Sequence, residues 1–195
     1  MMNCTEIYNH FVPFIEQILN SDYSDELYYC DHSFDINEHV YMVSGVTRAA
    51  IVDENYDWIV KYDIDCHEYC EREIDLYQKA ICNRLEMCFP ECAYIGTFQD
   101  IPLYAFRKAK CNYHSRNLFN EELEYIKTHK SPLSERNKSV AADLLKSWNE
   151  DIFEALSEFC YENEINDLHG NNVGWIDGKL VLIDFAGYSD SEEDY

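Results

Sequence analysis

The apolar residues near the N-terminus follow a helical period. In residues 3–20 they recur three and four positions apart, which predicts an amphipathic helix in which Pro13 marks the place of a kink. Residues 21–38 are acidic, rich in tyrosine and without a period, so we expect a connection there. Residues 1–38 are therefore predicted to form an N-terminal helix followed by an acidic connection.

Between residues 39 and 110 the pattern changes to short runs of β-forming residues separated by polar turns. Five such runs predict strands: residues 40–43, 49–52, 58–62, 93–98 and 102–107. Between the third and fourth runs, residues 67–84 space their apolar side chains for one helix face. The first three runs read as a β-meander, so this region is predicted to be a small antiparallel sheet with one helix.

Residues 111–189 are predicted to form a second, mostly helical region. Residues 111–137 are polar, with a short helical piece near 121–127, and residues 139–163 have the most regular helical spacing in the chain. An Asp177-Gly178 step then separates two apolar runs and predicts a tight hairpin. The runs are residues 173–176 and 179–183, and residues 190–195 form an acidic tail. The predicted fold class is α+β, with two lobes.

The charge of the chain excludes some classes of partner. The sequence has 38 Asp and Glu residues against 15 Lys and Arg, a formal net charge of −23. Such a surface repels phosphate backbones and anionic lipids, so we expect neither nucleic acid nor a membrane as partner. A dense carboxylate surface that imitates DNA or occupies a basic partner stays as an alternative, although acidic blocks such as residues 190–194 are more often solvated tails.

The cysteines and the apolar content bear on compartment and metal binding. No run approaches the roughly 18 apolar residues of a membrane span, and the first residues lack a basic signal start, so we expect a cytoplasmic protein. The nine cysteines are then expected to be reduced thiols, mostly buried. Cys66/Cys70 and Cys88/Cys92 are each spaced by four residues, which favours packing on a helix face over a zinc site with its tighter spacing.

The residues that suggest chemistry lie between positions 167 and 187. Asp167 lies on the loop after the long helix, Asn172 follows five residues later, and the hairpin brings Asp184 back toward them. The arrangement suits a divalent metal held by Asn172 and Asp184, with Asp167 facing an attacking hydroxyl. Phosphoryl transfer requires this division between metal and nucleophile-positioning group. The plainer alternatives are a solvated acid for Asp167, a turn carboxamide for Asn172, and a loop brace rather than a phosphate contact for His169.

These motifs resemble the protein-kinase-like superfamily. Asp167-Leu168-His169-x-x-Asn172 is similar to its catalytic loop, in the D-x-H-x-x-N form common in aminoglycoside and other small-molecule phosphotransferases. Ile183-Asp184-Phe185 is similar to its metal-binding D-F-G segment. The resemblance spans about residues 40–187 and is nearest in kind to the very small kinases of T7-like phages and of bacterial effector proteins.

The resemblance implies roles for residues upstream. Gly45 and Thr47 would belong to the phosphate-covering loop, and Lys61 would pair with phosphate and act in catalysis beside Asp167. Glu73, with Glu71 as the alternative, would pair with that lysine. The strand that ends in Arg107 and Lys108 would lead into the adenine-binding hinge. The implied cofactors are ATP and Mg²⁺.

The sequence also departs from the family pattern. Ile165 and Asn166 stand where a His-Arg pair is usual, and Ala186 replaces the glycine of the metal segment. Gly45 is a single glycine where three are usual, so it also reads as a simple hairpin turn. The large helical half that binds peptide substrates is missing.

The function that the resemblance implies is a minimal Ser/Thr protein kinase that acts on a host protein, in the cytoplasm of that host if the chain is a phage or effector protein. Two alternatives remain open at this point. One is a small-molecule kinase, and the other is a pseudokinase or acidic binding module without catalysis.

Overall fold

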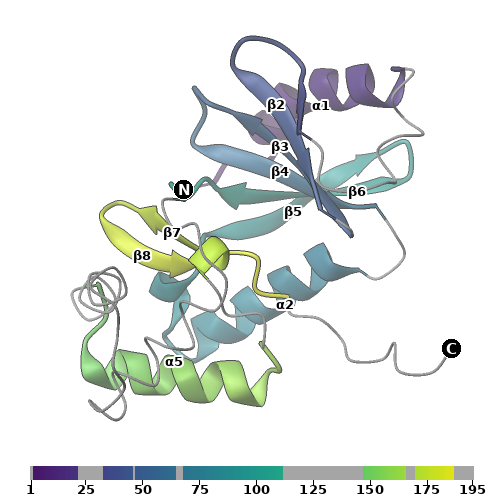
Figure 1. Ribbon diagram of the computed structural model, residues 1–195. Helices are drawn as coiled ribbons and strands as arrows, with labels where there is room; N and C mark the ends of the chain where they lie inside the picture. Colours follow the sequence, from purple (N-terminus) through teal and green to yellow (C-terminus); the bar gives the residue numbers. More distant parts are fainter. Residues whose placement is uncertain are drawn as a thin grey trace, which may run out of the picture. The chain divides into compact units, whose positions relative to one another are not determined.

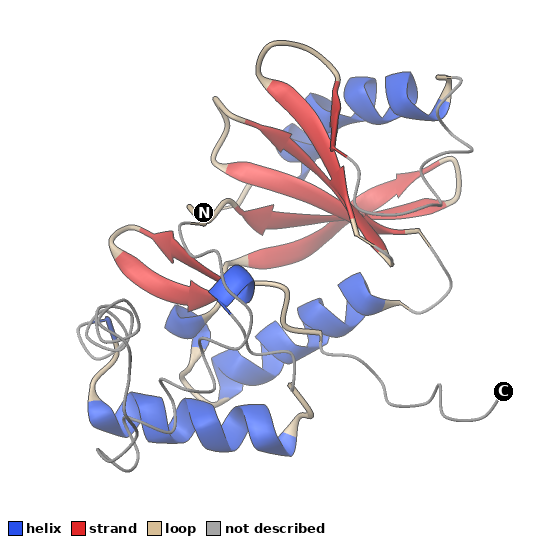
Figure 2. Cartoon of the chain, viewed as in Figure 1, coloured by secondary structure: helices blue, strands red, loops and turns tan. Residues whose placement is uncertain are grey.

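The computed structural model describes residues 2–21, 33–45, 47–64, 68–111, 147–165 and 170–186. The chain divides into two compact units. The sheet unit comprises Met1–Asp75 and Glu91–Lys108, and the hairpin unit comprises Leu76–Pro90 and Ala109–Tyr195. Figure 1 shows the elements in chain order, and Figure 2 shows that strands dominate the first unit. The fold class is mixed α+β, as the sequence predicts.

The sheet unit is built on a six-stranded antiparallel sheet in the order β1-β2-β3-β4-β6-β5 (Figure 1). The strands are β1 (Ser33–Asp35), β2 (Val40–Ser44), β3 (Arg48–Asp53), β4 (Trp58–Asp63), β5 (Cys92–Phe98) and β6 (Ile101–Arg107). All five predicted strands are present, and β2, β3 and β4 form the predicted meander. Turn residues between short apolar runs were sufficient to find them, and in β3 the side chains alternate between a buried and a more exposed face.

The sequence analysis missed β1. We expected residues 21–38 to be only a connection, but Ser33–Asp35 pairs with β2 and forms an edge of the sheet. The turn between the two strands is closed by Asn37, whose Oδ1 accepts hydrogen bonds from the backbone nitrogens of His39 and Val40 at 2.8 and 2.9 Å. Three residues are too few to show an alternating pattern, so pairing with β2 rather than local propensity makes this strand.

Helix α1 (Cys4–Leu19) covers one face of the sheet. Asn3 caps it by accepting a hydrogen bond from the backbone of Glu6, and Pro13 lies inside the helix. Its buried residues Ile7, Phe11, Ile15 and Ile18 are 0–1% exposed. They pack against one set of strand residues: Val40, Met42, Ala49, Ile51, Val60, Tyr62, Leu103 and Ala105. Because strand side chains alternate, Val60 and Tyr62 lie on the α1 face and Lys61 between them projects from the opposite face.

Helix α2 (Tyr69–Cys82) follows β4, and its N-terminus is capped from that strand. Both carboxylate oxygens of Asp63 accept from the backbone nitrogen of Cys70, at 3.1 and 3.2 Å. A carboxylate at a helix N-terminus satisfies a free N–H and interacts favourably with the helix dipole. The end of β4 and the start of α2 are therefore tied together.

The hairpin unit contains β7 (Val173–Ile176) and β8 (Lys179–Leu182). Asp177 and Gly178 both have positive φ, 50° and 75°, as a tight two-residue hairpin turn requires. The backbone of Trp175 pairs with that of Lys110, at 2.9 and 3.0 Å between nitrogen and oxygen. At Gly174 an added Cβ would lie 2.8 Å from the Cβ of Ala109, so this close approach requires a glycine.

The prediction of one continuous helix over residues 139–163 is wrong at Trp148 and Asn149, where the chain is not helical. Helix α5 (Glu150–Glu162) begins only after Asn149, which has an extended backbone with ψ of 169°. The side chain of Asn149 accepts from the backbone nitrogen of Ile152 at 2.9 Å and so starts a new helix. Residues 139–146 and the predicted helical piece near 121–127 lie outside the described residues. Over the ranges that are described, no helix combines the length and apolarity that a membrane span needs.

Candidate active site

An ion pair within the sheet unit forms the centre of the candidate site. Lys61 on β4 donates from Nζ to Oε2 of Glu73 on α2, at 2.9 Å. The Glu73 side chain is 0% exposed and that of Lys61 is 12% exposed. Glu71, the alternative partner in the sequence, is exposed on the same helix. The structure therefore brings Lys61 together with Glu73.

The ammonium of Lys61 is held from more than one side. Its Nζ lies 4.4 Å from the ring centre of Phe106, which suits a cation–π contact. In the sheet, Ala50 and Tyr104 are the register partners of Lys61 on β3 and β6. Glu73 and the Phe106 ring thus both contact the ammonium of Lys61.

Arg48 is a second cation beside Glu73, and the sequence analysis gave it no role. Its Nη1 lies 3.5 Å from the same Oε2 of Glu73, and its side chain is 16% exposed. Only the register of β3 and β4 places it near Lys61, because the two residues are 13 positions apart (61 − 48 = 13).

Four cysteines of the described residues are buried and carry protonated thiols. Burial, with the charge of Glu73 as the next cause, raises the pKa of the Cys70 and Cys92 thiols far above the ordinary value. Burial likewise raises the pKa of Cys88 and of Cys160 to about 12. Neutral thiols are poor nucleophiles and poor metal ligands, so these four residues serve as core.

The expected packing of Cys88 and Cys92 on one helix is wrong. Cys88 lies in the short helix η2 (Glu86–Cys88) of the hairpin unit, whereas Cys92 begins β5 in the sheet unit. Pro90 lies between them, where helix is disfavoured. Cys66 lies outside the described residues. Within the part of the chain that the structure describes, no three His, Cys, Asp or Glu side chains are grouped as metal ligands.

The turn with Gly45 and Thr47 joins β2 to β3. The backbone nitrogen of Gly45 donates to the carbonyl of Arg48 at 2.9 Å, and the carbonyl of Thr47 accepts from Ile64 at 2.8 Å. An added Cβ at Gly45 would meet only the Arg48 oxygen, at 3.9 Å. Space therefore does not demand a glycine at this hairpin turn. Val46 lies outside the described residues.

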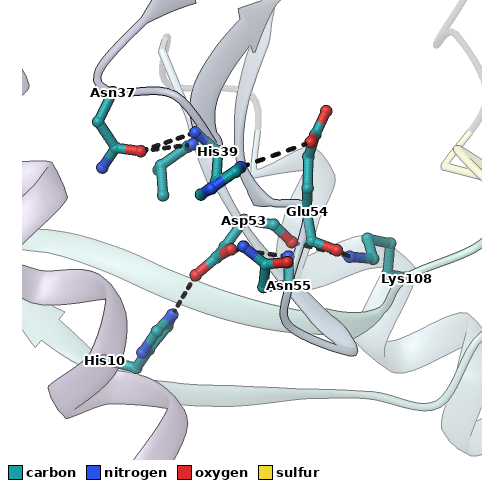
Figure 3. Close-up of polar contacts among 8 residues, drawn as sticks. His10, Asn37, His39, Asp53, Glu54, Asn55 and Lys108 are labelled. Atoms are coloured by element: carbon teal, nitrogen blue, oxygen red, sulfur yellow. Dashed lines mark hydrogen bonds and ion pairs between the residues drawn. The ribbon is translucent and has the colours of Figure 1, made fainter.

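Arg107 and Lys108 lie at the other end of β4 from its junction with α2. Arg107 is the register partner of Trp58, three residues before Lys61, which is about 10 Å along the strand. Nζ of Lys108 donates to the carbonyls of Asp53 and Glu54, each at 2.8 Å (Figure 3). The structure does not bring the ammonium of Lys108 together with Lys61; it holds the turn between β3 and β4.

A polar cluster that the sequence analysis missed ties α1 to the same turn. His10 Nε2 lies 2.9 Å from Asp53 Oδ2 (Figure 3), and the His10 ring stacks on Tyr56 at 4.2 Å between centres. Burial raises the pKa of Asp53, but hydrogen bonds from the Asn55 backbone and from His10 outweigh burial and leave the pKa lowered. His10 and Asp53 are 43 residues apart, so no local pattern could have indicated this pair.

In the hairpin unit, Asn172 and Asp184 lie at the open end of the β7–β8 hairpin. Asn172 ends the short helix η3 (Gly170–Asn172), is 6% exposed, and accepts a backbone hydrogen bond from Ile183 at 2.8 Å. Asp184 follows with φ of 57°, a left-handed conformation that is uncommon outside glycine. This backbone ends the strand alternation at Asp184, and such conformations cluster at functional sites.

The residues after Asp184 anchor this segment in the core of the hairpin unit. Phe185 is 2% exposed, and its ring centre lies 4.8 Å from that of Phe89. Ala186 is 0% exposed. Asp184 therefore lies between a regular hairpin and two buried residues, so its position is fixed on both sides.

Asn172 and Asp184 are candidate oxygen donors for a magnesium ion, because one carries a carboxamide and the other a carboxylate. Mg²⁺ in phosphoryl-transfer proteins is held by one or two protein oxygens, and substrate phosphates and waters complete its coordination. The backbone hydrogen bond from Ile183 to Asn172 links the two residues, because Asp184 directly follows Ile183. Their side chains offer two oxygen ligands of this kind. Asp167 and His169 lie outside the described residues, so the third part of the predicted constellation has no described position.

No protein-family model matches the sequence, and no curated protein is significantly similar to it.

Proposed function

We propose that the protein is an ATP- and Mg²⁺-dependent phosphotransferase with a minimal protein-kinase-like fold. One observation carries the proposal: a lysine on the third strand of an antiparallel meander is paired, at 2.9 Å, with a fully buried glutamate on the helix that follows. In protein kinases a lysine at this place contacts the nucleotide phosphates and is oriented by a glutamate of the next helix.

The energetics of the pair favour a functional reason for keeping it. A buried ion pair often stabilises a fold no better than apolar residues of the same volume, because both charges lose their hydration. On the Lys61 face of the sheet, the Phe106 ring and the Arg48 guanidinium lie beside the pair. A charge pair that is buried although it adds little stability supports a functional role for it.

The hairpin unit supplies the second support. Asn172 and Asp184 would hold Mg²⁺, which when bound neutralises phosphate oxygens. Lys61 would orient the phosphates of ATP, and Asp167 would position the acceptor hydroxyl and take up its proton. The net charge of −23 favours a cationic acceptor, and a Ser or Thr in a basic segment of a host protein suits that field.

The test is transfer of label from γ-labelled ATP with Mg²⁺. The acceptor panel consists of a basic protein mixture, a polycationic aminoglycoside and a cell lysate. Labelled protein bands support the protein kinase, and labelled aminoglycoside supports the small-molecule kinase. If nothing is labelled although MgATP binds, the protein is a pseudokinase, and if MgATP does not bind, the proposal fails.

Matched variants separate catalysis from folding. Lys61→Met and Asp184→Asn should each abolish transfer, and Asp167→Ala should abolish transfer while MgATP still binds. Asp177→Asn changes an aspartate with positive φ in the same hairpin, where Asn-Gly forms the turn equally well, and it should transfer like the natural protein. Lys79→Met, at an exposed lysine of α2, is the control for Lys61→Met.

A further inference from the structure

Two cations on adjacent strands reach one buried carboxylate. Lys61 Nζ and Arg48 Nη1 lie 2.9 and 3.5 Å from the same Oε2 of Glu73. The register aligns Ala50 with Lys61 and Arg48 with Asp63, so both cations project from the sheet face that α1 does not cover. Glu73 therefore has a close partner in Lys61 and a more distant one in Arg48.

Arg48 is held in place independently of Lys61. Its guanidinium lies 5.3 Å from the ring centre of Tyr69, the first residue of α2, which is 8% exposed. In the sheet it stands directly opposite Asp63, the residue that caps α2. The guanidinium thus links β3 to the start of α2. It also keeps its charge at every relevant pH, whereas a buried lysine can lose its proton.

The proposed function makes a demand on this arrangement. When the Lys61 ammonium binds nucleotide phosphates, its interaction with the Glu73 carboxylate becomes weaker. Because Glu73 is 0% exposed, water cannot replace the interaction that the carboxylate loses. A buried carboxylate without a counter-charge is unfavourable. Arg48 is the cation that can stay beside Glu73 during this change.

We propose that Arg48 is a positioning residue: by balancing the charge of Glu73 it holds α2 in place while Lys61 binds phosphate. The proposal rests on the proposed function, and it goes beyond that function by assigning a role to Arg48, which the resemblance places in the 45–50 segment without giving it a function. Arg48 acts through Glu73 and does not itself contact the nucleotide.

The first experiment measures the dissociation constant of MgATP by calorimetry, well below the melting temperature of each variant. Arg48→Met should weaken binding about tenfold, the equivalent of roughly 1.4 kcal/mol. Arg48→Lys keeps the charge and should stay within about threefold of the natural protein. Arg84→Met removes an exposed arginine and should leave binding unchanged. In the transfer assay, Arg48→Met should raise KM for ATP more than it lowers kcat.

The second experiment tests whether Arg48 acts through Glu73. In a Glu73→Gln background there is no charge to balance, so adding Arg48→Met should weaken MgATP binding by less than about twofold. An undiminished tenfold loss would mean that Arg48 contacts phosphate directly and would overturn the positioning role. Arg48→Gln, which keeps a polar group beside Glu73, replaces Arg48→Met if the latter does not fold.

The outcomes separate the two proposals. If the natural protein does not bind MgATP, the proposed function fails and the role of Arg48 fails with it. If the natural protein binds and Arg48→Met binds equally well with a lower melting temperature, Arg48 is only structural and the inference alone fails.

Discussion

Replacing Lys61 with methionine tests the central ion pair through its effect on folding. The change removes the cation 2.9 Å from a carboxylate that is 0% exposed and leaves Arg48 at 3.5 Å. Removal of one member of a buried pair costs about 3–5 kcal/mol because the remaining charge is left without its counter-charge. Since Arg48 compensates in part, we expect a loss near the lower end, about 3 kcal/mol. That is a large share of the roughly 5–15 kcal/mol by which domains are stable.

The assay is urea unfolding followed by far-UV circular dichroism at neutral pH. Lys61→Met should lower the urea midpoint with little change in the slope of the free energy of unfolding against urea. The double variant Lys61→Met, Glu73→Leu removes both charges of the pair and leaves Arg48 opposite Asp63. It should recover part of the lost stability, because an apolar pair of similar volume often replaces a buried ion pair without loss. A loss below about 1 kcal/mol in Lys61→Met, or a double variant no more stable than it, would refute this reasoning.

Three further predictions concern α1, the turn at its edge and the metal segment. Phe11→Ala should destabilise the sheet unit by about 3–5 kcal/mol in the same assay, because the Phe11 side chain is 0% exposed in the core under α1; a loss under about 1 kcal/mol would contradict that packing. The pKa of the Asp53 carboxyl is lowered from 3.8, so this carboxylate stabilises the fold above that pH and the stabilisation disappears as the pH falls through the lowered value. The difference in free energy of unfolding between the natural protein and Asp53→Asn should therefore narrow in acid. A difference that does not depend on pH would show that the ionised carboxylate does not stabilise the fold. MgATP at about 100 times its dissociation constant should stabilise the natural protein by roughly 2.7 kcal/mol in a melting experiment, and Asp184→Asn should remove this gain while Asp177→Asn keeps it.

Local pattern was sufficient for most of the elements. The strands of the meander and the Asp177-Gly178 hairpin each carry their signal within ten residues, in alternation and in turn chemistry. The choice of Glu73 over Glu71 also followed from a local feature, the apolar face of α2. A helix or strand could be predicted where one hydrophobic period runs through the whole element.

The two wrong helix predictions overlooked local signals, the cap residue Asn149 and Pro90 between Cys88 and Cys92. The omissions concern features that depend on contacts between distant parts of the chain. β1 exists because β2 offers a partner, the His10–Asp53 pair joins residues 43 positions apart, and Arg48 reaches Glu73 only through the register of the sheet. The resemblance places Lys108 at the end of the strand that leads into the nucleotide hinge, and this stays a prediction. The Lys108 ammonium donates to two backbone carbonyls whose positions no pattern in the sequence gives.

The position of helix α1 has a consequence for how the chain can be shortened. A boundary drawn from the kinase-like motifs would start near residue 40 and would remove α1. Eight buried strand residues share their core with this helix. Two of them, Val60 and Tyr62, flank Lys61 on β4 and are 0% and 6% exposed. In a truncated protein, the apolar face of β4 opposite Lys61 would be exposed to water. Inactivity of such a fragment would therefore say nothing about the chemistry of the intact chain.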